Sequence, residues 1–177
     1  MELRYQGTLR RKMLNKLFYQ GPSFGRLYTE YAMKGRIDER ATIGASGEIN
    51  IKAPIHQVWN VLVDLPAWPQ FDANFSDVKL ESTVVVGAQA SFKIRGFPIQ
   101  GKFAVVRPNH ELTWVGKSLW TKAIDRHVIE AISSSATRLC LEESLSGVFV
   151  PFMFSNARLV KQHQEWLSAI KVFIEAQ

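Results

Sequence analysis

The sequence has little cysteine and no long apolar run. Cys140 is the single cysteine among 177 residues, so no disulfide can form within the chain, as expected in a reducing compartment. No stretch of about 18 apolar residues, the length that spans a bilayer, occurs. The first residues also lack the apolar segment of a secretory signal. We therefore expect a cytoplasmic protein.

Motifs for several common chemistries are missing as well. No metal-ligand spacing links Cys140 to the four histidines, which are His56, His110, His127 and His163. The glycines at 44 and 47 are too close together for a phosphate-binding loop and precede a strand-like segment instead of a helix. No Gly-x-Ser-x-Gly nucleophile motif occurs. The sequence thus predicts neither a metal site nor a cofactor.

The composition that remains indicates one globular domain with a basic extension. Apolar residues make up 46% of the chain, enough for a packed core. Residues 1–40 hold nine Lys or Arg against four Asp or Glu, whereas the remaining residues hold thirteen against twelve. The positive charge is therefore a property of the first forty residues. We predict a basic extension over residues 1–40 and a globular domain over residues 41–177.

The extension has the pattern of two short helices. Leu9, Met13 and Leu17 recur every four residues among basic neighbours, which indicates a basic amphipathic helix. A second helix is expected over about residues 24–34. The extension can pack on the domain with its basic face in solvent, contact anionic lipid head groups, or bind a protein or nucleic-acid partner. No specific nucleic-acid contact is predicted, and the oligomeric state is left open.

Residues 49–71 predict a strand, a helix and an aromatic loop in quick succession. Ile49 and Ile51 alternate with polar residues, as in a half-buried strand. Pro54 suits the first position of a helix, whose apolar stripe is Ile55, Val58, Trp59 and Leu62. Two prolines then end the helix near Asp64, and the loop that follows carries Trp68 and Phe71.

The rest of the chain predicts an antiparallel meander followed by a long helix. Strand-like segments occur at residues 78–86, 89–95, 100–106, 111–116, 121–133 and 137–146, with turn signals between them. From residue 151 to 175 the period becomes helical, with one face formed by Phe152, Asn156, Leu159, His163, Trp166, Ile170 and Phe173. Asn156 and His163 interrupt this apolar face. They either find protein partners or indicate water or a ligand inside.

One acidic residue lies on an apolar face in the last predicted strand. Glu143 alternates in phase with Leu139, Leu141 and Leu145, so it needs a partner or a raised pKa. A three-residue turn at 134–136 would place His127 directly opposite Glu143. Such a pair could orient the polar end of a ligand or move a proton, or it could only fix the strand register.

Several of these motifs resemble one protein superfamily. Ala53-Pro54 followed by Val58-Trp59, and then Asp64-x-x-x-Trp68-Pro69-x-Phe71, resembles the opening of the START-like (SRPBCC) superfamily of polyketide cyclases, dehydrases and lipid-transport proteins. His127 and residues 143–147 are similar to later motifs of one bacterial branch. The resemblance begins near residue 44 and continues to the C-terminus.

The resemblance implies an α+β helix-grip fold. In this fold a curved antiparallel sheet of six to seven strands wraps around a long C-terminal helix, with a ligand cavity between them. The superfamily contains carriers, sensors and enzymes, so it does not imply one function.

Binding of a hydrophobic or aromatic small molecule, lipid-like or polyketide-like, is the first functional hypothesis. The candidate ligand-binding residues are Trp59, Trp68, Phe71, Phe92, Trp114, Phe152, Asn156, His163 and Trp166. The alternative is a polyketide cyclase or dehydratase type of enzyme that uses His127 and Glu143 as its acid/base pair. Few polar groups converge on the inward faces, which favours binding. A third hypothesis is an accessory factor that acts on a membrane or a protein through the basic extension.

Overall fold

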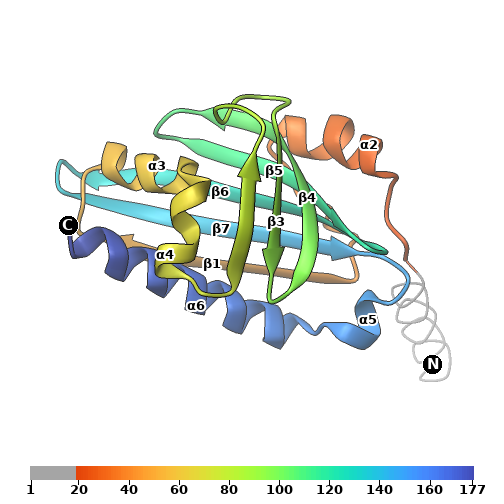
Figure 1. Ribbon diagram of the computed structural model, residues 1–177. Coiled ribbons are helices and arrows are strands. Elements are labelled where there is room, and N and C mark those ends of the chain that lie inside the picture. The colour runs from red at the N-terminus through yellow and green to blue at the C-terminus, as the bar shows by residue number, and fades with distance from the viewer. Residues whose placement is uncertain (1–18) are drawn as a thin grey trace, which may run out of the picture.

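The computed structural model describes residues 19–177, so the helix predicted near residues 9–17 lies outside the described residues. In the described part, seven antiparallel strands form one sheet in the order β1-β7-β6-β5-β4-β3-β2 (Figure 1). The strands are β1 (Ile43–Ile51), β2 (Phe75–Leu80), β3 (Gln89–Ile94), β4 (Phe97–Arg107), β5 (Glu111–Ser118), β6 (Thr121–Ser133) and β7 (Ala136–Ser146). The long helix α6 (Asn156–Glu175) packs on the concave face, which confirms the α+β helix-grip prediction.

The strand, helix and aromatic segment predicted over residues 49–71 are present. Pro54 caps α3 (Ile55–Val63) from the position before its first residue, and the predicted apolar stripe faces the core. The segment predicted as a loop instead forms two short helices, η3 (Leu65–Ala67) and α4 (Trp68–Phe71). Each carries a proline in its first turn, where no backbone N–H is needed. Trp68 is thereby held in the core.

Two predicted boundaries are wrong. The second half of the strand predicted at 78–86 is a connection, in which Val85 and Val86 are exposed. The helix predicted from residue 151 is divided into α5 (Val150–Met153) and α6, with Phe154 in extended conformation between them. Ser155 starts α6 anew, because its side chain accepts a hydrogen bond of 3.2 Å from the backbone N–H of Arg158.

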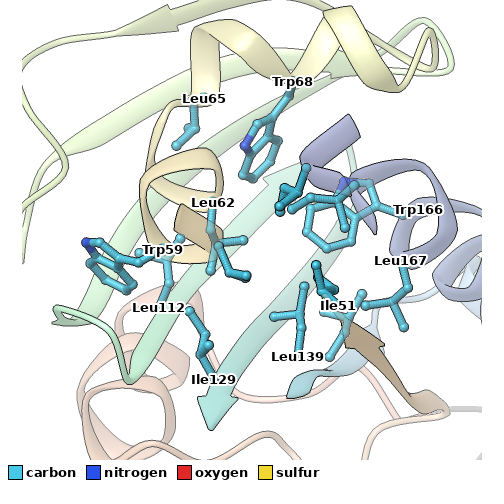
Figure 2. Close-up of a cluster of buried hydrophobic side chains, with 14 of the residues drawn as sticks. Ile51, Trp59, Leu62, Leu65, Trp68, Leu112, Ile129, Leu139, Trp166 and Leu167 are labelled. Carbon is cyan, nitrogen blue, oxygen red and sulfur yellow. The ribbon is translucent and has the colours of Figure 1, made fainter. Parts of the chain in front are cut away.

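The main core lies between the concave sheet face and the helices α3, α4 and α6. Figure 2 shows Leu62 and Trp59 from α3 meeting Leu112, Ile129 and Leu139 from the sheet, with Trp166 and Leu167 of α6 beside them. Ile170 and Ile174 extend the buried face of α6 towards its end. No helix within residues 19–177 is long and apolar enough to cross a membrane.

The convex face of the sheet is covered by the end of the N-terminal extension. Three consecutive helical pieces, α2 (Phe24–Arg26), η1 (Leu27–Tyr31) and η2 (Ala32–Lys34), occupy the range predicted as a short helix. Leu27 and Ala32 are buried in one cluster with Ala104, Val115 and Ile124 of the sheet. The division at residue 40 stays a prediction.

We expect Ile170→Ala to lower the free energy of unfolding by about 2–5 kcal/mol, because it leaves a cavity at a fully buried site between α6 and the sheet. Val172→Ala on the same helix is the control, since Val172 is 69% exposed. Urea denaturation measures both. Equal small losses in the two variants would contradict the packing of α6 described here.

A second pair of variants tests whether residues 24–34 belong to the fold. Leu27→Ala removes a side chain buried on the convex face and should cost about 2–5 kcal/mol, whereas the exposed Met33→Ala should cost little. Thermal unfolding compares them. A wild-type melting temperature for Leu27→Ala would mean that this segment is dispensable.

Candidate ligand-binding site

A cavity of about 210 Å³ lies between the concave sheet face and the N-terminal half of α6. Its apolar wall includes Trp68 of α4, Trp114 of β5, Leu141 of β7 and Trp166 of α6. Gly116 makes room for the Trp114 ring, because a Cβ atom at this position would lie 2.7 Å from ring atom Cζ3. Large aromatic side chains therefore shape the cavity, and Gly116, which has no side chain, leaves space for one of them.

A row of polar side chains crosses the sheet beneath this cavity. Trp114 of β5 is directly opposite Asp125 of β6, which is directly opposite Glu143 of β7. Directly opposed residues point to the same face of an antiparallel sheet, so all three side chains face inward. His163 of α6 completes the row, with Nε2 at 2.9 Å from Glu143 Oε2. We call Asp125, His127, Glu143 and His163 the polar cluster.

The predicted register of the last hairpin is wrong by two residues. His127 is opposite Leu141 and not Glu143. The turn has two residues, since Ser133 pairs with Ala136, and a bulge between Ala131 and Ser133 shifts the pairing by one more. Glu143 therefore bonds to His163 of α6, and the carboxyl group nearest to His127 is that of Asp125, two residues away on the same strand.

Asp125 and His127 are close without forming a hydrogen bond. They are two residues apart on β6, so both point inward, and His127 Nδ1 is 2.9 Å from Asp125 Oδ1. The angle between them does not suit a hydrogen bond, and each of these atoms lacks a hydrogen-bond partner in the protein.

Five buried polar atoms in the described residues have no hydrogen-bond partner, and all five belong to residues that line the cavity. They are Trp68 Nε1, Trp114 Nε1, Asp125 Oδ1, His127 Nδ1 and His163 Nδ1. An unsatisfied buried donor or acceptor costs about 1–3 kcal/mol. Their concentration at one cavity indicates that water or a polar ligand completes them.

Burial also changes the acidity of the polar cluster. Desolvation raises the pKa of the Glu143 carboxyl above its ordinary value, and the charge of Asp125 adds to this effect. The hydrogen bond from His163 acts in the opposite direction without cancelling it. Despite its two carboxylates and two imidazoles, the cluster is not arranged to hold a metal ion, and no other group in residues 19–177 is.

The structure brings together only some of the residues predicted to form the site. The cavity is lined by Trp68, Trp114, His127, Glu143, His163 and Trp166. Trp59, Phe71 and Phe92 pack in or against the core behind the lining. Phe152 is 80% exposed on α5, and Asn156 accepts a hydrogen bond from the backbone N–H of Gly44.

Asp125 is the member of the polar cluster that the sequence analysis missed. Strand alternation could have identified Asp125, because a residue two positions before His127 on the same strand points to the same inward face.

No protein-family model and no curated protein matches the chain. Solved structures do match. A hypothetical protein from Helicobacter pylori superposes with a TM-score of 0.68 at 17% identity, over 76% of this chain and 89% of that one. A START superfamily protein from Mycobacterium smegmatis gives 0.65 at 13% identity, over 75% of this chain and 97% of that one. The Zhui aromatase/cyclase from a Streptomyces species gives 0.64 at 12% identity, over 75% and 93%. These similarities confirm the predicted START-like helix-grip fold.

The raised pKa of Glu143 predicts a pH dependence of stability. The folded chain holds this proton more tightly than the unfolded chain, so the contribution of Glu143 is most favourable below the ordinary carboxyl pKa. It is lost as the pH rises through the raised pKa. Glu143→Gln removes the ionisation, so its stability relative to wild type should increase as the pH rises.

Urea denaturation of both proteins across mildly acidic to neutral pH measures this difference. Glu81→Gln, at an exposed position, controls for the loss of a carboxylate as such. A difference between Glu143→Gln and wild type that stays constant with pH would contradict a raised pKa.

Proposed function

We propose that the protein binds a small hydrophobic or aromatic molecule in the cavity, with an oxygen-bearing edge of the ligand against the polar cluster. The observation that supports this most is the set of five unpartnered buried atoms around an otherwise aromatic and aliphatic wall. Binding sites commonly combine an apolar wall with a few placed polar groups.

The unpartnered atoms suggest what the ligand presents. An indole N–H only donates, so Trp68 and Trp114 require acceptors such as carbonyl, ether or phenol oxygens. Asp125 Oδ1 is an acceptor without a partner, so it suits a ligand hydroxyl. Hydroxylated or keto-bearing aromatic molecules, which include polyketide-like ones, meet both demands.

The size of the cavity favours a compact ligand. Its volume of about 210 Å³ is smaller than the ~300–1,000 Å³ typical of pockets for drug-sized molecules. A molecule of two or three fused rings suits this space better than a lipid with two long acyl chains. A lipid-like ligand would have to be a short single-chain compound.

Acid/base catalysis of the cyclase or dehydratase kind is the second candidate function. The observation that favours it is the presence of two histidine–carboxylate contacts in one cavity, His127 with Asp125 and Glu143 with His163. A neutral imidazole can remove a proton next to a ligand carbonyl, and a carboxyl with a raised pKa can protonate a leaving hydroxyl. In this role His127 is the base and Glu143 the acid.

A role for the basic extension stays a prediction. Residues 1–18 carry five Lys or Arg against one Asp or Glu, which suits an anionic membrane surface. The described part of the extension, residues 19–40, lies on the domain.

Ligand binding can be tested with naphthalene and naphthol, whose fluorescence reports their environment. Naphthol should bind about three- to tenfold more tightly than naphthalene, because its hydroxyl completes a buried hydrogen bond. Ala123→Trp fills the cavity from β6 and should abolish binding of both. Ala131→Trp, at an exposed position of the same strand, is the matched control and should bind as wild type does. The site would be contradicted if naphthalene and naphthol bound with the same affinity to the wild type and to both variants.

Glu143→Gln separates the carrier from the enzyme. In a carrier it should alter the affinity for naphthol modestly, since glutamine keeps the shape and a hydrogen bond to His163. In an enzyme it should leave binding of a substrate intact and lower turnover by about 10²–10⁴, the usual effect of one proton-transfer group. A screen of hydroxylated polyketone substrates for loss of water, with wild type and variant, makes the distinction.

A further inference from the structure

Exposed apolar side chains gather around the mouth of the cavity. Of the twelve large hydrophobic side chains that are exposed in residues 19–177, seven lie here. They belong to the β3–β4 turn, the β5–β6 turn and the connection from β7 to α6, and we call them the mouth rim: Phe97, Leu119, Trp120, Val148, Phe149, Phe152 and Met153. Phe97, Leu119, Trp120 and Met153 also line the cavity. The rim and the cavity are therefore continuous.

The β5–β6 turn exposes two large apolar side chains to solvent, and its backbone has a conformation that is unfavourable for one of these residues. Ser118 pairs with Thr121, so Leu119 and Trp120 form the whole turn. Leu119 has φ of 48°, a left-handed conformation that glycine adopts at far lower cost than leucine. The ring of Trp120 packs edge-on against Phe149, with centroids 5.6 Å apart, which joins this turn to the β7–α6 connection. A strained turn that exposes two large apolar side chains indicates a function at the surface.

The surroundings of the rim are positively charged. Residues 94–98, 117–122 and 147–158 contain Arg95, Lys117, Lys122 and Arg158 and no Asp or Glu. Arg95 is paired with Glu165 of α6 at 2.9 Å, so the positive charge comes from Lys117, Lys122 and Arg158. Figure 1 shows α5 at the end of the molecule opposite to α3 and the C-terminus. The N-terminal extension reaches the domain at this same end, because Lys122 Nζ donates a hydrogen bond of 2.6 Å to the carbonyl of Pro22. Residues 1–18, which hold five basic residues against one acidic, precede this point in the sequence.

We propose that the mouth rim docks onto the surface of a membrane that contains anionic lipids. Aromatic and aliphatic side chains flanked by Lys and Arg are the composition of interfacial membrane sites, where rings enter the head-group region and cations meet phosphates. A second copy of this chain fits poorly, since it would bring two clusters of cations together.

Docking in this orientation gives the cavity a direct opening to the acyl chains. A hydrophobic ligand then passes between the bilayer and the cavity without crossing water. This consequence rests on the proposed ligand binding, whereas the docking itself does not.

The test uses the full chain and vesicles of phosphatidylcholine mixed with phosphatidylglycerol. Cosedimentation should show binding that weakens with salt and with pure phosphatidylcholine. Phe149→Ser and Phe152→Ser should each weaken binding about tenfold, the effect of one aromatic side chain withdrawn from an apolar phase. Ile132→Ser is the matched control for Phe149→Ser, because Ile132 is about as exposed (53% against 50%) but lies at the end of β6 that is away from the rim. It should bind as wild type does.

Trp120 provides a second measurement, because it is the exposed one of five tryptophans, the other four being at most 8% exposed. Brominated lipids in the anionic vesicles should quench part of the fluorescence of the wild type. Trp120→Phe should still sediment with the vesicles and lose this quenching.

Three results would overturn the proposal. Vesicle binding that is unaffected by Phe149→Ser and Phe152→Ser, but lost when residues 1–18 are deleted, would assign it to the extension alone. Self-association of the wild type that these variants abolish would make a second copy the occupant. The absence of vesicle binding would exclude the membrane. Failure of the proposed function can be distinguished from failure of membrane docking. Ala123→Trp should lose naphthol binding and keep vesicle binding, whereas Phe149→Ser should keep its affinity for naphthol.

Discussion

The site depends on one constraint, the burial of two carboxylates on the concave face of an antiparallel sheet. Strand register places Asp125 directly opposite Glu143, so two carboxyl groups lie side by side where water is largely excluded, and burial raises the pKa of Glu143. The fold places an imidazole beside each carboxyl group: His163 of α6 is hydrogen-bonded to Glu143, whereas His127 lies 2.9 Å from Asp125 without a hydrogen bond. The Glu143–His163 bond is also a polar link between sheet and gripped helix, so the chemistry of the cavity and the packing of α6 are coupled.

Much of the fold could be predicted from periodicity, because the signal repeats over many residues. The stripe from Leu159 through His163 and Trp166 to Ile170 defined the inward face of α6. The interruption of the predicted helix before Asn156 was missed because it depends on a single side chain. Ser155 caps α6, and a periodic pattern does not reveal such a cap. The valines at 84–86 were assigned to a strand on propensity, but no neighbouring strand pairs with them there.

For the candidate site, the sequence predicted which side chains face inward but not which residues lie opposite one another. A turn one residue shorter than predicted and one bulge shifted the β6–β7 register by two in total. An even shift keeps every side chain on its face, so His127 and Glu143 still face inward. It exchanges their partners, and Asp125 enters beside Glu143. Strand alternation therefore finds which residues enter a cavity, whereas hydrogen-bond partners require the register itself.

The covering of the convex face by residues 24–34 has a consequence for selectivity. Leu27 and Ala32 seal one side of the central strands while the cavity lies on the other, and β5 is buried from Glu111 to Gly116. The curvature of the sheet cannot then change without disturbing the packing on the convex face. The wall that carries Trp114, Asp125 and Glu143 is consequently stiff, and under the proposed function a ligand would have to conform to it in outline and in the spacing of its oxygens.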